Sequence, residues 1–338
     1  MSPERGPVRL TEADRDAVLV LAHLEGMSPA ARHDLAWREG SASACVRAIV
    51  GGRGRASARD RAVASAIDPG PVRSALRRAG GRMAVPGGEE YPSPLLDLTD
   101  PPVCLFLRGR RLTPWPAAVA MVGARSCTPY GREVAEWLAR ELAELGLAIV
   151  SGAALGIDAA AHRGALAAGG LTVAVLGSGI DVPHPRTNRG LIDRVAGTGL
   201  VLSEYPPGVE ARPHRFPARN RLVAGLARGV IVVEGAPGSG SLITVEFAGD
   251  LGREVMAGGS PAIHFALVNG SPAVLAVIED RVVGAGVVLG DDGDAHREQY
   301  GRSRAIACRP CRPPSPCRSS TTAPGGTWRR RCRPCSPI

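Results

Sequence analysis

Two short apolar runs, each followed by a glycine-containing loop, constrain the fold of this 338-residue chain more than any other feature. The first run covers residues 119–122 and the second residues 147–150, and the segment between them, 132–145, has apolar residues at helical spacing. Strand, helix and strand in this order predict a parallel βαβ unit. Such units bind ligands beyond the carboxyl ends of their strands. We therefore expect the functional site in the loops 123–130 and 151–158.

Three further apolar runs continue the alternation of strands and helices. They cover residues 171–176, 200–202 and 230–233, and each is followed by glycine or polar residues. Strands that are apolar throughout are typical of a parallel sheet with helices on both faces. The sequence therefore predicts an α/β fold over residues 115–257, namely an extended Rossmann-type, doubly wound, mostly parallel sheet whose last helix starts at Ser241.

The chain before this domain divides into two parts. Residues 8–80 are rich in alanine and arginine at helical spacing and are broken by glycines, which predicts a small N-terminal helical domain of the helix-hairpin-helix type. Such a domain either grips a DNA backbone or packs against a partner domain. Residues 81–114 are proline-rich and end in the apolar run 103–107, which predicts a linker followed by an edge strand.

The net charge of +9 does not by itself indicate a nucleic-acid partner. All 41 basic residues are arginines, and nine of them lie beyond residue 300, where Asp and Glu are absent, so the first 300 residues carry 32 charges of each sign. A binding surface must therefore be a local patch. Because no apolar run approaches the roughly 18 residues of a membrane span and the N-terminus lacks a signal-peptide core, we expect a cytoplasmic protein without membrane contact.

Residues 291–338 differ in composition from the rest of the chain. They are rich in Arg, Pro, Ser and Cys, and the C-x-x-C pairs Cys308/Cys311 and Cys332/Cys335 have the spacing of a tetrahedral zinc site. Because almost no apolar residues surround them to close a core around a metal, we predict no metal site and a disordered tail. A GC-rich gene read out of frame gives the same composition, so a frameshift or a fusion is our hypothesis for this segment.

Both predicted loops have the composition of an anion-binding site. Glycine and small residues let backbone N–H groups approach a ligand, and the helix N-terminus behind them adds a partial positive charge. Arg125 in the first loop could form a fork onto a phosphate, or it could be a surface arginine paired with a carboxylate. Neither loop matches G-x-G-x-x-G or G-x-x-x-x-G-K-[ST], so we expect no dinucleotide or triphosphate cofactor.

Residues 213–221 concentrate cations and an aromatic ring ahead of a helix predicted over 220–227. Cations beside a ring can hold a phosphate backbone while a base stacks on the ring; the alternative is a solvated basic loop anchored by its phenylalanine. Arg219 could instead pair with Glu204 or Glu234 and hold the loop in place. The candidates for DNA contact in this segment are His214, Arg215, Phe216, Arg219, Asn220 and Arg221.

A glycine- and serine-rich stretch follows the run 230–233. Ser239, Gly240 and Ser241 offer N–H and hydroxyl groups to an anion at a helix start, although Ser241 could equally be an N-cap.

Together these segments resemble the DNA-processing protein A family, also called DprA or Smf. VGARSCTPYG, SGAALGIDAAAH, HRFPARNRLVAGLA and EGAPGSGSLIT stand in the family's order and spacing, over about residues 90–257. The resemblance implies a homodimeric Rossmann-type protein that binds and protects single-stranded DNA and loads the RecA recombinase onto incoming DNA in natural transformation. It also implies that the N-terminal helices form a SAM-like domain. The positions that it assigns to DNA are Arg125, His214, Arg215, Arg219, Asn220, Arg221 and Ser239 to Ser241.

The sequence departs from the family pattern after Ala257. Residues 258–290 form a divergent extension, in which 274–289 resembles a pair of strands. In the family, parts of the surfaces for dimerisation and for RecA lie toward this end. Whether this chain forms a homodimer and contacts RecA therefore depends on the divergent residues after Ala257.

A hydrolase of the nucleoside-monophosphate phosphoribohydrolase (lysine-decarboxylase-like) group is the alternative function. That group uses a G-G-x-G-T-x-x-E loop, and aligning Gly240-Ser241 with its Gly-Thr puts Thr244 where the catalytic glutamate should be. Because a threonine supplies no carboxylate, only Glu204 and Glu234 at strand ends remain as candidate acids. We predict a binding protein rather than an enzyme.

Overall fold

The computed structural model describes residues 10–235, 239–257, 263–268, 271–278 and 281–287. The predicted tail and its cysteines lie outside the described residues. None of the helices in the described part is long and apolar enough to cross a membrane.

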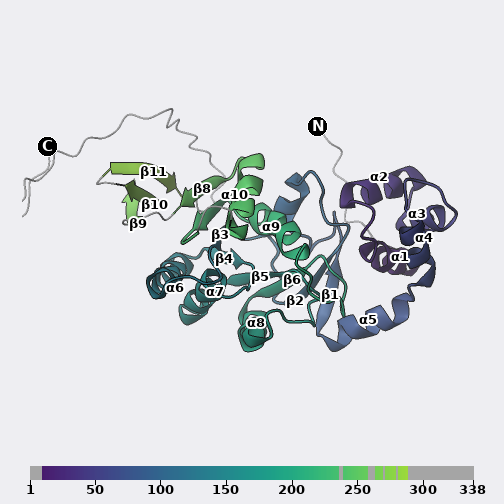
Figure 1. Cartoon of the computed structure of the whole chain (residues 1–338), viewed down its shortest axis with the longest axis horizontal. Helices are drawn as coiled ribbons and strands as arrows, with labels where there is room; N and C mark the ends of the chain where they lie inside the picture. Colours follow the sequence, from purple (N-terminus) through teal and green to yellow (C-terminus); the bar gives the residue numbers. More distant parts are fainter. Residues whose placement is uncertain (1–9, 236–238, 258–262, 269–270, 279–280, 288–338) are drawn as a thin grey trace, which may run out of the picture. The chain divides into compact units, whose positions relative to one another are not determined.

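Short helices make up the N-terminal part of the chain (Figure 1). Each begins at a Ser, Thr or Asp whose side chain accepts a hydrogen bond from a backbone N–H of the first turn, so local capping defines where each one starts. The helices are α1 (Glu12–Ala22), α2 (Pro29–Glu39), α3 (Ala42–Val50), α4 (Ala58–Ala66) and α5 (Pro69–Arg78).

These helices share a hydrophobic core with the rest of the chain. Leu19 and Leu24 belong to the same cluster of buried residues as Phe106, Leu176 and Ile192. The N-terminal helices therefore pack against the α/β part through this shared core, and the linker is not their sole connection to it.

The main sheet has eight strands in the described residues, in the order β1-β2-β6-β5-β4-β3-β7-β8. Neighbours from β6 to β8 pair in parallel, whereas β2 pairs antiparallel with both β1 and β6. The prediction of a Rossmann-type, mostly parallel α/β fold is thus confirmed. The strands are β1 (Gly81–Ala84), β2 (Leu105–Gly109), β3 (Ala118–Val122), β4 (Ala148–Ser151), β5 (Thr172–Leu176), β6 (Leu200–Ser203), β7 (Gly229–Val232) and β8 (Glu254–Ala257).

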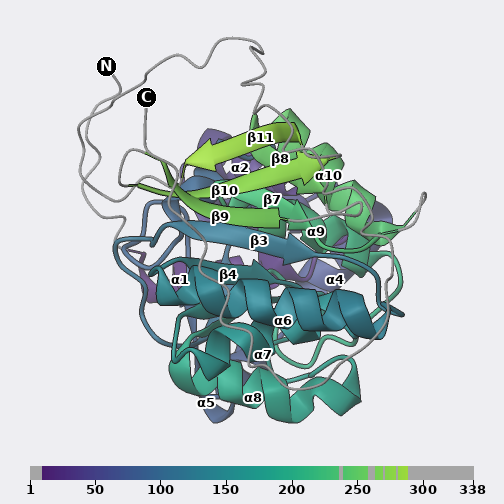
Figure 2. The ribbon, with the colours of Figure 1, turned by 90° about the vertical axis from the view of Figure 1, so that its left-hand side faces the viewer.

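Helices cover both faces of this sheet. In Figure 1, α6 (Pro129–Glu144), α7 (Ile157–Ala167) and α8 (Arg189–Thr198) lie below the strands, while α9 (Arg215–Gly225) and α10 (Gly240–Asp250) lie above them. The helix α6 runs alongside β3 and β4 when the molecule is turned (Figure 2).

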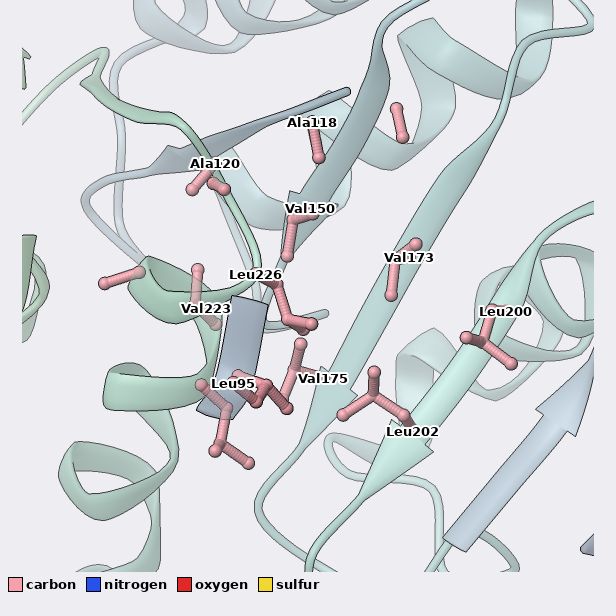
Figure 3. Close-up of a cluster of buried hydrophobic side chains, with 14 of the residues drawn as sticks. Leu95, Ala118, Ala120, Val150, Val173, Val175, Leu200, Leu202, Val223 and Leu226 are labelled. Carbon is pink, nitrogen blue, oxygen red and sulfur yellow. The ribbon is translucent and has the colours of Figure 1, made fainter. Parts of the chain in front are cut away.

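Successive side chains of the central strands pack into two separate hydrophobic cores, one on each face of the sheet, because side chains alternate between the faces along a strand. Val119 and Met121 of β3 pack with α6 and α7. Ala118 and Ala120 of the same strand point to the other face, toward Leu226 beyond the end of α9 (Figure 3). Side-chain packing on both faces of the sheet holds these strands in place. The loops that follow β3, β4 and β7 therefore begin at fixed points of the fold.

The apolar run predicted as an edge strand at 103–107 is β2, and it is not at the edge. Its outer side pairs with β1, in a register that places Arg82 opposite Leu107. The sequence of β1, GRMA, has neither an apolar run nor an alternating pattern, so nothing in it predicts a strand. Between β1 and β2 the proline-rich segment forms the short 3-10 helix η1 (Ser93–Asp97).

A separate antiparallel sheet follows β8. It consists of β9 (Ile263–Val268), β10 (Ser271–Ile278) and β11 (Arg281–Val287), with β10 in the middle. The pair of strands that the sequence suggests at 274–289 corresponds to β10 and β11.

Candidate nucleic-acid interface

A cleft of about 340 Å³ lies at the carboxyl ends of β3 and β7, where the first predicted loop meets the helices α9 and α10. This is the edge of the sheet at which the sequence analysis expects the site. Its walls bring together candidates from segments more than 100 residues apart. The lining includes Gly123, Arg125, Asp158, Phe216, Arg219, Asn220, Ser239, Gly240, Ser241 and Thr244.

Backbone and carboxylate hydrogen bonds fix the loop that carries Arg125. The Glu234 carboxylate, just beyond β7, accepts from the Thr128 backbone N–H at 2.9 Å and from the Thr128 hydroxyl at 2.7 Å. The Ala124 N–H donates to the Glu234 carbonyl at 2.7 Å, and the Ile157 N–H donates to the Ala124 carbonyl at 3.2 Å. The backbone is therefore anchored on both sides while the Arg125 side chain remains exposed.

Arg125 lies over an aromatic ring at the mouth of the cleft. Its guanidinium carbon is 5.0 Å from the centroid of Phe216, a distance at which the ring's quadrupole attracts the cation. The imidazole of His184, exposed and tilted, lies 5.2 Å from the same ring. In the described residues Arg125 forms no ion pair with a carboxylate. The Arg125 guanidinium is therefore available to bind an anion. The Phe216 ring contacts both Arg125 and His184.

His184 was not among the sequence candidates. It lies in the segment VLGSGIDVPHP, residues 175–185, and an isolated histidine beside prolines gives no signal of a stacking role. Only the fold brings it from the loop after β5 to Phe216.

The helix α9 begins at Arg215, five residues before the predicted start at 220. Pro217 lies in the first turn of this helix, where a proline is tolerated because the N–H groups there have no intrahelical acceptor. Helical spacing then puts residues 215 and 219 on one face and residues 216 and 220 on the neighbouring face, and residues 216, 219 and 220 all line the cleft. His214 precedes the helix and is exposed.

Arg215 and Arg221 are buried and paired inside the protein. Arg215 is 5% exposed, donates to the Glu25 carboxylate and the Glu210 carbonyl, and lies over the Tyr205 ring at 4.9 Å. Arg221 is 7% exposed and contacts the Glu204 carboxylate at 2.6 Å. In this structure both arginines hold α9 to its surroundings, and neither lines the cleft.

Arg219 lines the cleft but is only 4% exposed. Its guanidinium donates to the carbonyls of Gly152, at 2.6 Å, and Val175. Burial lowers the pKa of Arg219, and the nearby Asp158 carboxylate opposes that shift. Burial correspondingly raises the pKa of Asp158, against the charge of Arg219. The carboxylates considered from the sequence, Glu204 and Glu234, are not its partners. Arg219 therefore ties together the ends of β4, β5 and α9.

Small polar groups form the remaining wall. The Asn220 side-chain N–H donates to the Gly240 carbonyl at 3.0 Å, and the hydroxyls of Ser239 and Ser241 are 2.6 Å apart. Ser239, not Ser241, is the N-cap residue of α10, and its side chain makes no capping hydrogen bond. The Thr244 hydroxyl is buried without a hydrogen-bond partner in the described residues. The hydroxyls of Ser239, Ser241 and Thr244 therefore line the cleft at the start of α10, where a ligand can accept hydrogen bonds from them.

The two glutamates that the sequence left as candidate catalytic acids already have partners within the protein. Glu204 holds Arg221, Glu234 holds Thr128, and neither lines the cleft, while Thr244 lies in it at the position of the expected acid. Among the described residues no group of His, Cys, Asp and Glu side chains is arranged to hold a metal ion.

Gly152 has a specific steric role that a substitution tests. A Cβ atom at this position would lie 2.5 Å from the guanidinium carbon of Arg219. We expect Gly152→Ala to lower the free energy of unfolding by about 1 to 3 kcal/mol, the usual range for overpacking a buried site. Urea unfolding measures it, with Gly190→Ala in α8 as the control, because no heavy atom lies within 4 Å of a Cβ there. Equal stability of the two variants would contradict the tight contact.

Comparison with known proteins adds family evidence to this geometry. The model of the DNA recombination-mediator protein A family matches residues 82–276, which is more than half of the chain. The chain belongs to this family. The match begins before the estimated start near residue 90 and continues past Ala257.

The relatives are DNA-processing proteins. One from Streptococcus pneumoniae, named DNA processing protein DprA, is 49% identical over 168 residues, which are 49% of this chain and 59% of the relative. A putative DNA processing protein DprA from Mycobacterium tuberculosis is 44% identical over 195 residues, which are 54% of this chain and 50% of the relative. The chain thus spans about half to three-fifths of the length of these curated relatives.

A solved structure confirms the fold at the level of the family. The X-ray structure of DNA processing protein A from Streptococcus pneumoniae has a TM-score of 0.63 and 36% identity, and the similarity covers 75% of this chain and 88% of that one. The resemblance to the DNA-processing protein A family that the sequence motifs indicated is thus confirmed.

Proposed function

We propose that this chain binds single-stranded DNA in the cleft at the carboxyl edge of its sheet. The observation that carries the proposal is the stack of Arg125 on Phe216 at the cleft mouth, at 5.0 Å. A cation next to an aromatic face is the combination that neutralises a phosphate while a base stacks on the ring. Membership of a DNA-processing family supports the same partner.

The residues proposed to contact DNA divide by their surroundings. Arg125, His214, Phe216, Asn220 and Ser239 to Ser241 are at least partly accessible, or line the cleft, and would touch the strand directly. Arg215, Arg219 and Arg221 are buried. Their contribution to DNA binding would come through the position of α9, unless the strand displaces their internal partners.

Protection of incoming DNA, loading of a RecA recombinase, homodimer formation and a cytoplasmic site of action belong to the same proposal. The family description, DNA recombination-mediator protein A, supports the part that concerns recombination, and the resemblance of the sequence motifs implies the other parts.

We expect single-stranded DNA to bind more tightly than duplex of the same sequence. Stacking on Phe216 needs a base that is not paired, and a flexible strand lets successive phosphates reach Arg125 and α10. Fluorescence anisotropy with one labelled oligonucleotide, alone and annealed to its complement, measures the difference at several salt concentrations. Equal affinities, or an absence of binding at moderate salt, would contradict the proposal.

A further inference from the structure

The outer side of α6 carries a ridge of aromatic and apolar side chains. Tyr130 is 75% exposed, Trp137 is 39% exposed, and the partly exposed Val134 lies between them. Because residues three, four and seven positions apart share one side of a helix, the three side chains form a continuous ridge. Figure 2 shows α6 in front of β4, on the outside of the sheet. We call this ridge, together with Glu133 and Glu144 beside it, the α6 face.

The opposite side of α6 belongs to the hydrophobic core. Ala135, Leu138 and Leu142 are buried in the cluster that includes side chains of β3 and α7. The helix is therefore attached to the sheet through these residues, and packing within the chain leaves Tyr130 largely in solvent. Tyr and Trp are the residues that dominate binding energy where proteins contact one another. The ridge is thus a candidate docking surface.

The charges of α6 are mainly acidic. Its glutamates outnumber its arginines, with Glu133, Glu136, Glu141 and Glu144 against Arg132 and Arg140. Two of the glutamates are already paired, Glu141 with Arg140 at 3.3 Å and Glu136 with Arg163 of α7 at 3.4 Å. The charges in these two pairs cancel.

Glu133 and Glu144 are exposed, and neither has an ion-pair partner among the described residues. A helix turns by about 100° per residue, so both lie within about 40° of Trp137 around the axis, whereas Arg132 lies about 140° away. The charge that a partner would meet beside the ridge is therefore negative.

We propose that the α6 face binds a basic amphipathic helix of a partner protein. Apolar side chains at helical spacing on the partner would pack against Tyr130, Val134 and Trp137, as the ridges of one helix pack into the grooves of another. Lysines or arginines beside them would face Glu133 and Glu144.

Other occupants of the α6 face are opposed by charge. A second copy of this chain would bring the same two unpaired carboxylates to the contact, and nucleic acid or an anionic membrane would bring phosphates. The residues of the α6 face do not line the DNA cleft, so this surface is separate from the proposed DNA site.

The test uses the full chain and a fluorescein-labelled peptide of about 15 residues, which matches the length of α6, built from Ala, Leu and Lys with its leucines at helical spacing. We expect saturable binding by anisotropy. The double variant Glu133→Lys with Glu144→Lys should weaken it by roughly twentyfold or more, because two attractive charges become repulsive. Tyr130→Ala should weaken it by roughly tenfold. All three positions are exposed, so circular dichroism should show an unchanged fold.

Glu246→Lys with Asp250→Lys is the matched control. It makes the same charge change at two exposed positions of α10, on a different helix. It should leave the affinity for the peptide within about threefold, the size of a general charge effect.

Two further peptides separate helix docking from charge alone. An analogue with Glu in place of Lys should not bind, and a Lys peptide with proline at its centre should lose binding because it cannot form the helix. The proposal is overturned if the Lys peptide does not bind, if either analogue binds equally well, if the control double variant weakens binding as much as the Glu133 and Glu144 variant, or if Tyr130→Ala leaves the affinity unchanged. It is also overturned if the full chain self-associates in analytical ultracentrifugation and Tyr130→Ala abolishes that association, since a second copy would then occupy the α6 face.

Discussion

Replacing Arg219 with methionine is expected to lower the free energy of unfolding by about 3 to 5 kcal/mol, the range for leaving a buried charge uncompensated. The change leaves the Gly152 carbonyl without the donor it has at 2.6 Å. It also leaves the Asp158 carboxylate, which is 7% exposed, without its neighbouring cation. Urea unfolding followed by circular dichroism measures the loss.

The pH dependence of the Arg219→Met variant distinguishes this mechanism from a simple loss of packing. Burial already raises the pKa of Asp158 and Arg219 opposes it, so the variant should have a still higher pKa at Asp158. A folded-state pKa above the unfolded value means that the folded state binds the proton more tightly, so stability rises as pH falls through the folded pKa. The deficit relative to the parent should therefore shrink toward acidic pH.

The double variant Arg219→Met with Asp158→Asn completes this experiment. A neutral amide removes the uncompensated charge, and part of the lost stability should return. If the double variant is as unstable as the sum of the two single variants, the two residues are not coupled and Arg219 acts only through the carbonyls of Gly152 and Val175.

Local sequence was enough to place the central strands. The run 171–176 became β5 at 172–176, and the run 119–122 became β3 at 118–122. Each is a continuous apolar segment bounded by glycine or polar residues, and a fully buried parallel strand requires that composition. The edge strand β1 has only partly buried residues before Ala84, so its sequence is under no such requirement and gave no signal.

Local sequence was not enough to separate the arginines of the site. The sequence analysis named both Arg125 and Arg219 as candidates for DNA contact, yet Arg125 is exposed and Arg219 is 4% exposed. The hydrogen-bond acceptors of Arg219 are the carbonyls of Gly152, just after β4, and Val175 of β5, both far from residue 219 in the sequence. The carboxylate partner of Arg215 is Glu25, 190 positions earlier, in the loop between α1 and α2. Pairings of this range depend on how the elements pack, and no periodicity within one segment encodes them.

The packing of α9 also gives its two faces different expected effects on substitution. Its buried side chains Arg215 and Arg219 contact the N-terminal part and the strand ends, and Arg219 also lines the cleft. Its partly exposed side chains Phe216 and Asn220 form the rest of its cleft face. Substitutions on the buried face should change stability and affinity together. Substitutions at the cleft mouth should change affinity alone, and Arg125 offers the clearest case because its side chain is exposed and its loop is anchored by backbone contacts.

Arg125→Ala is expected to weaken single-stranded DNA binding by about 1.5 to 3 kcal/mol, the range for a lost hydrogen bond to a charged group. If the guanidinium neutralises one phosphate, the slope of log affinity against log salt should flatten by about 0.7, the contribution of one phosphate on a single strand. Anisotropy titrations at several salt concentrations give both quantities, and thermal melting should show an unchanged fold.

Arg194→Ala is the control for a general effect of charge, because Arg194 is exposed on α8 and does not line the cleft. It should reduce affinity by less than about 0.5 kcal/mol, as is usual for a surface substitution away from a site. An Arg125→Ala protein that stays folded and keeps both its affinity and its salt slope would mean that the loop after β3 does not contact the DNA. The anchored geometry around Glu234 and Ala124 would then serve only to close the sheet onto α6.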